Sequence, residues 1–424
     1  MNIVIEKIVY PGKSLARANG KVIFTDQGLP GETVEIAIVK DTKGYTQAKT
    51  IKIITPSPNR QEPRCNHYQV CSPYQPIEYP QQIEIKKQQL QEIISRQLKI
   101  DFPSLNFRKS PQIWGYRNKI KVKIIRIKTL PHLAYNLPET DDQFIPVDQC
   151  LLSPEQTNLF MSEFIKKLRQ KDFPAVNQLT IKENKENKLL IYISHDGSLN
   201  IGNFSLALES LIKQFNPEGV VLINEVTYAR VVIHGNNFLK ETIDHKQFLI
   251  GSNSFFQINT SILELLVKDL RDNLILNENT ILADLYCGVG TFGILLAEQI
   301  KQVIGVEIEQ ESFLFLEKNI KLNNLNNFDL RLCDCNDTLE SLLKKDIDIV
   351  IIDPPKKGAG KEVCNKLVKS EVDTIIYISC DPATLTRDLK ILSSGYDIKN
   401  IYGYDFFPQT PHIETMVVLN KKNI

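Results

Sequence analysis

The chain has 424 residues, of which 42% are hydrophobic and 24% charged, so it can bury sizeable cores and its length predicts two or three domains. No uninterrupted apolar stretch approaches the length of a membrane span, and Glu6 and Lys7 interrupt the opening apolar residues. We therefore expect a cytoplasmic protein with no membrane partner, whose eight cysteines are mostly reduced.

The net charge of +1 conceals an uneven distribution. Residues 1–60 carry a net charge of +4 and residues 81–130 a net charge of +9, which leaves −12 for the rest of the chain. A polyanion would therefore meet the N-terminal third first. From charge alone, an ordinary solvated surface is the favoured alternative.

Short β-rich runs fill the first 55 residues. Turn signals such as Pro11-Gly12 and Asn19-Gly20 separate strands expected at residues 4–9, 22–24, 34–39 and 48–54. This spacing predicts a small β-barrel. A proline-rich linker at residues 56–63 follows it.

The next segment combines cysteines with basic residues. Cys65 and Cys71 are followed three residues later by Tyr74, and in a reduced protein such clustered cysteines indicate metal binding or catalysis more than disulfides. Residues 83–98 have helical periodicity, and we expect Lys86, Lys87 and Arg96 on the surface of that helix.

Basic and mainly apolar residues alternate at residues 115–123, which predicts a strand with one cationic face. A phase slip after Ile124-Ile125 indicates a β-bulge. Tyr116 could stack on a nucleic-acid base, and an ordinary half-buried strand is the alternative.

From about residue 251 the pattern becomes strand, helix, strand, which is typical of a doubly wound α/β sheet. The glycine turn Cys287-Gly288-Val289-Gly290 follows one buried strand, and Glu307 ends the next. An acid at that distance is placed to accept hydrogen bonds from ribose hydroxyls. The turn and acid alone do not distinguish S-adenosylmethionine from a dinucleotide.

Three further motifs contain residues suited to catalysis. Cys380 stands where an apolar strand gives way to a helix, a place suited to a nucleophile. Asp353-Pro354-Pro355 closes another apolar run, and His412-Ile413-Glu414-Thr415 follows a proline-containing loop.

In this order, these motifs resemble the RNA 5-methyluridine (uracil-C5) methyltransferase family over almost the whole chain. The resemblance implies a Rossmann-like doubly wound methyltransferase domain, an OB-like TRAM barrel and a central α+β region that binds RNA. We expect the barrel at residues 1–55, the central region at 56–250 and the catalytic domain at 251–424.

The resemblance also implies the roles of individual residues. Cys380 would attack C6 of the uracil and Glu414 would remove the proton from C5. The site of S-adenosylmethionine would be lined by Gln257, Tyr286, Thr291, Glu307, Asp334 and Asp353.

Many members of this family hold a 4Fe–4S cluster on cysteines at the position of Cys65 and Cys71, with a distant fourth that Cys150 could match. Here Tyr74 replaces the third cysteine. Two readings stay open, a metal site on Cys65, Cys71 and Cys150 or three packed thiols.

Two other functions are alternatives to uridine methylation. A 5-methylcytosine RNA methyltransferase also uses a cysteine nucleophile, but its cysteine motifs look different. A non-catalytic RNA-binding or ribosome-assembly factor is disfavoured because Cys380 and Glu414 are both present. Since TRAM-bearing bacterial relatives mostly modify 23S rRNA, the resemblance favours that RNA, with tRNA as the alternative.

Overall fold

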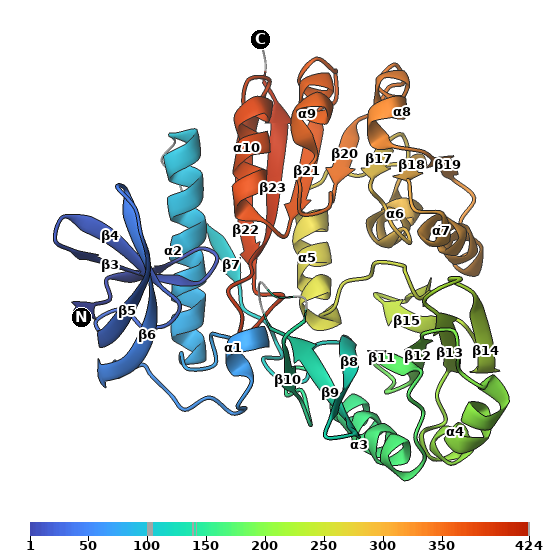
Figure 1. Ribbon diagram of the computed structural model, residues 1–424. Coiled ribbons are helices and arrows are strands. Elements are labelled where there is room, and N and C mark those ends of the chain that lie inside the picture. The colour runs from blue at the N-terminus through green and yellow to red at the C-terminus, as the bar shows by residue number, and fades with distance from the viewer. Residues whose placement is uncertain (100–104, 138–139, 141, 423–424) are drawn as a thin grey trace.

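The computed structural model describes residues 1–99, 105–137, 140 and 142–422. Figure 1 shows an N-terminal barrel, a long helix beside it, a central sheet with two helices, and a C-terminal sheet covered by helices. Among these residues no helix combines the length and hydropathy that crossing a membrane would require.

The N-terminal barrel is a six-stranded sheet in the order β1-β5-β6-β4-β3-β2. Its strands are β1 (Asn2–Val4), β2 (Lys7–Val9), β3 (Lys13–Ala18), β4 (Lys21–Thr25), β5 (Thr33–Asp41) and β6 (Tyr45–Thr55). The single strand expected at residues 4–9 was wrong, because the chain changes partner there: β1 pairs with β5, and β2 pairs with β3. Strand β3 was not expected at all.

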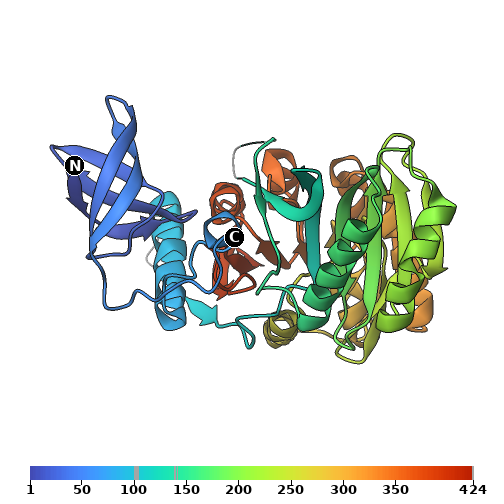
Figure 2. The same cartoon turned by 60° about the horizontal axis from the view of Figure 1, so that its bottom comes forward.

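Helix α2 (Tyr79–Leu98) stands between the barrel and the C-terminal layer in both views (Figures 1 and 2). Its Ile85 packs in a small cluster with Ile8 and Leu29 of the barrel, whereas its Leu90 packs in the core of the C-terminal layer. The expectation that Lys86 lies on the surface was wrong. Its side chain is fully buried and pairs with Asp405 at 2.5 Å.

The central sheet has the order β10-β9-β8-β11-β12-β13-β14. Its strands are β8 (Lys119–Ile127), β9 (Leu130–Asn136), β10 (Phe144–Pro146), β11 (Val176–Glu183), β12 (Leu189–His195), β13 (Gly219–Asn224) and β14 (Arg230–Gly235), with helices α3 (Glu155–Gln170) and α4 (Ile201–Phe215). A short helix, α1 (Tyr68–Cys71), precedes them.

Strand β8 has the alternation that its sequence predicts. Ile120 and Val122 are buried, while Lys121 lies exposed on the other face. The expected bulge was wrong, because β8 pairs with β9 without a register shift through residues 123–127. Tyr116 is also unsuited to base stacking, since its ring is buried and its hydroxyl donates to Pro408 O at 3.0 Å.

The C-terminal sheet has eight strands in the order β19-β18-β17-β20-β21-β23-β22-β7. They are β7 (Asn106–Arg108), β17 (Ile281–Leu285), β18 (Gln302–Glu307), β19 (Phe328–Leu332), β20 (Ile349–Ile352), β21 (Thr374–Ser379), β22 (Tyr396–Tyr404) and β23 (Glu414–Lys421). A hairpin, β15 (Leu239–Ile243) and β16 (Lys246–Ile250), precedes this layer along the chain.

Helices α5 (Thr260–Asp272), α6 (Thr291–Leu296), α7 (Gln310–Leu322), α8 (Cys335–Leu342), α9 (Gly360–Val368) and α10 (Pro382–Leu392) cover the two faces of this sheet. Its central strands are parallel and buried on both sides, which explains their unbroken apolar runs. Strand β7 joins this sheet by pairing with β22, although it precedes the central sheet in the chain. The division of the chain at residues 55 and 250 stays a prediction.

Candidate active site

The predicted catalytic residues lie at one edge of the C-terminal sheet. Strands β17, β18, β20 and β21 run parallel, so their carboxyl ends meet at that edge, where doubly wound folds bind ligands. Strand β23 runs antiparallel to β21 and pairs Thr415 with Ser379. The next step in that register sets Glu414 opposite Cys380.

The turn that carries Cys380 is held by local hydrogen bonds. Asp381 caps helix α10, and its Oδ1 accepts from the backbone N–H groups of Ala383 and Thr384, each at 2.9 Å. The backbone N–H of Asp381 donates to Ser379 Oγ at 3.2 Å. These bonds fix the direction in which the partly exposed thiol leaves the strand.

Acidic groups surround the thiol. Burial, followed by the charges of Glu414 and Asp353, raises the pKa of Cys380 to about 12, and Lys356 partly opposes this rise. Burial and the charge of Asp353 likewise raise the pKa of Glu414 far above its usual range. The charge of each carboxylate therefore favours the protonated form of its neighbours.

The glycine turn has two conformational requirements. Gly288 has a φ of +57°, and a side chain there would meet no atom closer than Phe255 O at 4.0 Å, so the space beside it is open. Gly290 has a φ of +88°, and a Cβ there would lie 2.4 Å from Leu316 Cδ1. The first glycine leaves room for a ligand, and the second permits close packing of α7.

Glu307 holds this turn from the end of β18. Its Oε2 accepts from Gly288 N at 2.8 Å, and its Oε1 accepts from the backbone N–H groups of Ile308 and Glu309 at 2.8 and 2.7 Å. A carboxylate has about four lone-pair sites, so three backbone bonds leave capacity for a further donor.

The other predicted cofactor residues surround this turn. Tyr286 has a φ of +61°, and Thr291 begins helix α6 directly after Gly290. Burial raises the pKa of Tyr286, and the charges of Cys335 and Asp334 raise it further, so these groups are neighbours. Asp334 caps α8 by accepting from Asn336 N at 2.8 Å. Cys335 begins this helix.

Gln257 is buried in the loop that leads into helix α5, and its carbonyl accepts from Asn118 Nδ2 at 3.0 Å. Lys182 is also buried, and its amine donates to the carbonyls of Gly251 and Ser254 in the same loop. The central sheet therefore fixes the loop that carries Gln257.

Sequence reasoning missed Asp284, which is almost fully buried near the end of β17. Its Oδ2 accepts from Gly293 N at 2.9 Å, and within the described residues its Oδ1 has no hydrogen-bond partner. Burial raises its pKa to about 7, and its charge in turn raises the pKa of Asp353. The sequence signal that could have identified Asp284 is an acid inside an apolar strand just before a glycine turn.

Comparison with known proteins gives the family of the chain. The family model described as tRNA (Uracil-5-)-methyltransferase matches residues 78–422, and the TRAM domain model matches residues 1–51. The chain belongs to the RNA (uracil-5-)-methyltransferase family.

Individual relatives agree over the full length. An uncharacterized RNA methyltransferase of Synechocystis sp. is 30% identical, and the match covers 100% of this chain and 96% of the relative. An uncharacterized RNA methyltransferase of Aquifex aeolicus is also 30% identical, and the match covers 100% of this chain and 99% of the relative. The crystal structure of Pyrococcus abyssi tRNA (uracil-54, C5)-methyltransferase in complex with S-adenosyl-L-homocysteine has the same fold. It has a TM-score of 0.74 at 24% identity and covers 99% of this chain and 100% of its own.

In this methyltransferase the three cysteines of the expected metal site influence one another: burial, followed by the charges of Cys150 and Cys65, raises the pKa of Cys71 to about 11. The residue at the third position does not join them. Tyr74 is buried against the barrel, and its hydroxyl accepts from Gln89 Nε2 at 3.1 Å.

In the ranges that the structure describes, no three His, Cys, Asp or Glu side chains form a group able to hold a metal ion. Cys65 Sγ accepts from Gln75 Nε2 at 3.1 Å instead. The donor set thus falls short of the four thiolates that such clusters use, and we assign no step to a cluster.

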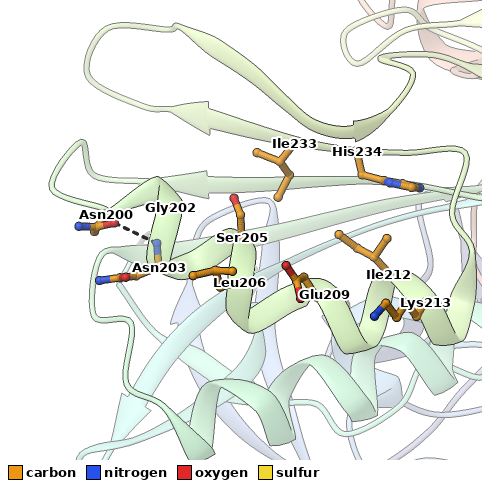
Figure 3. Close-up of a pocket in the computed structure, with 10 residues that line it drawn as sticks. All are labelled: Asn200, Gly202, Asn203, Ser205, Leu206, Glu209, Ile212, Lys213, Ile233 and His234. Atoms are coloured by element: carbon orange, nitrogen blue, oxygen red, sulfur yellow. Dashed lines mark hydrogen bonds between the residues drawn. The ribbon is translucent and has the colours of Figure 1, made fainter.

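A cavity of about 730 Å³ lies away from these residues, between helix α4 and strand β14. Figure 3 shows Ser205 and Ile212 of the helix facing Ile233 and His234 of the strand. None of the predicted site residues lines it.

Proposed function

We propose that this methyltransferase transfers a methyl group from S-adenosylmethionine to C5 of a uridine in RNA. The observation that carries the proposal is the register of β21 and β23, which sets a thiol and a carboxylate opposite each other at the ligand-binding edge of the sheet. Uracil C5 becomes nucleophilic only after addition at C6, so this reaction requires both a nucleophile and a base.

The residues present fit S-adenosylmethionine, which supplies the methyl group when bound. The open space beside Gly288 adjoins the carboxylate of Glu307, which retains capacity for ribose hydroxyls. The Pyrococcus enzyme with this fold was solved with the demethylated product of that cofactor. We propose that the residues that hold it are Gln257, Tyr286, Thr291, Glu307, Asp334 and Asp353.

The chain's own residues account for the protons and bonds of the reaction. The Cys380 sulfur forms a bond to C6 as its proton passes to a base, for which Asp353 is the candidate. After methylation, Glu414 accepts the C5 proton, the C5–C6 double bond reforms, and the sulfur leaves C6. Because burial raises the pKa of Glu414, its carboxylate is a strong base once ionised.

RNA containing 5-fluorouridine tests this mechanism. Fluorine at C5 cannot leave as the proton does, so the adduct to Cys380 should persist and migrate as a protein–RNA band in a denaturing gel. Cys380→Ala should lose both the band and methyl transfer while still binding S-adenosylmethionine. Cys364→Ala, which alters a buried thiol of α9, should retain the band. Methyl transfer by Cys380→Ala would contradict the mechanism.

Glu414→Gln tests the base. With ordinary RNA this variant should form and methylate the adduct but release it slowly, because no carboxylate accepts the C5 proton. The covalent band should then accumulate without fluorine. Normal turnover with no accumulated band would assign the base elsewhere.

As the RNA substrate we propose 23S rRNA. This proposal rests on the TRAM domain attached to a catalytic domain of this family. tRNA is a second candidate, because the Pyrococcus tRNA enzyme matches this chain over its whole length, barrel included. Transcripts of both RNAs, offered in parallel with radiolabelled cofactor, separate the two. Mapping of 5-methyluridine in RNA from a deletion strain and its parent then gives the position.

A further inference from the structure

The barrel sends one aromatic side chain into the catalytic layer. Tyr10 follows β2, and its hydroxyl lies 3.5 Å from Oδ2 of Asp381, the residue after the proposed nucleophile. Its ring packs against the hydrophobic cluster that contains Leu385 and Ile413 and stays partly exposed. Tyr10, near the N-terminus, therefore contacts the residue next to the proposed nucleophile, near the C-terminus.

The turn around Tyr10 is held firmly in this position. Gly12 has a φ of +98°, and a Cβ there would lie 2.9 Å from Pro411, in the loop that leads to Glu414. On the other side, Gln89 of helix α2 donates to Ile8 O at 2.9 Å. Both contacts place the turn against the catalytic layer rather than in solvent.

The Tyr10 hydroxyl contacts Asp381 and is influenced by the charges of the two proposed reacting groups, Cys380 and Glu414. Burial raises its pKa well above its usual value, and the charges of Asp381, Cys380 and Glu414 raise it further. The phenol is therefore neutral at physiological pH, and its proton is available to the Asp381 carboxylate. The ring remains a neutral, flat surface beside the turn that carries Cys380.

A groove begins at this turn. It has a volume of about 690 Å³ and is lined by the barrel turn at residues 11–14, helix α1 and the loop at residues 410–412. Lys13 and Lys49 belong to its lining, and both residues are exposed. Such a cationic groove suits a single RNA strand, whose phosphates attract lysine.

We propose that Tyr10 is a substrate-contacting residue of the active site, whose ring packs against the target uracil while the groove holds the neighbouring nucleotides. The barrel then forms a wall of the catalytic pocket and is more than a remote RNA anchor. A flipped base is commonly held by stacking on an aromatic ring, and the barrel places the Tyr10 ring beside the turn that carries Cys380, since its hydroxyl lies 3.5 Å from Asp381 Oδ2. The inference rests on the proposed uridine methylation.

The rate of single-turnover methyl transfer at saturating RNA tests the contact between Tyr10 and the target uracil. Tyr10→Ala should lower the rate about ten- to hundredfold, the usual range for loss of one base–aromatic contact. Tyr10→Phe keeps the ring and should stay within about threefold of the parent. Affinity for S-adenosylmethionine should not change in either variant. Tyr10→Leu retains an apolar contact with the catalytic layer and should be as slow as Tyr10→Ala.

The matched control is Tyr45→Ala, which removes another barrel tyrosine whose ring packs on Phe24. It should keep the parental single-turnover rate. Parental rates in both Tyr10→Ala and Tyr10→Leu would overturn the inference. A Tyr10→Phe variant as slow as Tyr10→Ala would also overturn it, because the hydroxyl and not the ring would then be required. An inactive parent protein would instead contradict the proposed function.

Discussion

Replacing Lys86 tests whether helix α2 stabilises the catalytic layer. Its amine lies 2.5 Å from Asp405 Oδ1 and 3.0 Å from Phe407 O, and neither side chain of the ion pair is exposed. Lys86→Met keeps the chain length but leaves the Asp405 charge buried without its partner. Breaking a buried pair in this way costs about 3–5 kcal/mol of unfolding free energy.

That loss would be a large part of the total, since natural domains are stable by about 5–15 kcal/mol. Urea unfolding measures it, and the next residue supplies the control. Lys87 is only partly buried, so Lys87→Met should change stability by less than about 0.5 kcal/mol. The double variant Lys86→Met/Asp405→Leu should recover most of the loss, because no charge is then stranded.

A cost below about 1 kcal/mol for Lys86→Met, or equal costs for both lysines, would refute the buried pair. Methyl transfer provides a second measurement. Asp405 begins the loop that leads to Glu414, and Gln82 of α2 donates to Gln409 in the same loop at 2.8 Å. Lys86→Met should therefore also slow methyl transfer under conditions where the protein is folded.

Four further results are expected. Glu307→Ala should weaken S-adenosylmethionine binding in calorimetry by about 1–3 kcal/mol, and unchanged affinity would move the ribose contact elsewhere. Lys182→Met should also weaken that binding, because the loop carrying Gln257 loses both hydrogen bonds from the Lys182 amine, whereas parental affinity would show that other contacts hold the loop. Burial raises the pKa of Asp284 to about 7, so the folded state binds more protons than the unfolded state and stability should fall as the pH rises from about 4 through 7. Asp284→Asn should flatten that fall in thermal denaturation, and an unchanged slope would assign it to other groups. Anaerobically purified protein and its Cys71→Ser variant should both contain negligible iron and sulfide, while iron in the parent alone would establish a cluster.

Local sequence signals were sufficient to predict much of the catalytic layer. Cys380 and Asp353 each follow a buried apolar run, and parallel strands bring such positions to one edge. The sequence motif also indicated Glu414. The opposition of Glu414 and Cys380 across β21 and β23 required the sheet order, because the last strand inserts beside β21 with β22 outside it.

Long-range contacts explain the failures. A lysine is rarely buried unless an acid pairs with it, so the sequence predicted Lys86 on the surface of its helix. Its partner, Asp405, lies 319 positions away and could not be recognised from the sequence. Tyr10 gave no signal, because it is a single aromatic residue in a turn of a barrel. The missed strand Lys13–Ala18 contains only Leu15 and two alanines as apolar residues, too few for a strand pattern.

The contact between Tyr10 and Asp381 joins residues 371 positions apart, and this has a consequence for protein synthesis. The barrel is synthesised early, but Asp381 and the residues of the C-terminal layer that pack on helix α2 are synthesised only when the chain is nearly finished. Until then, the faces of α2 that pack on residues such as Leu385 lack their cover. Contacts of such sequence separation form slowly, so folding intermediates of this protein should expose α2 and bind chaperones that recognise apolar helices.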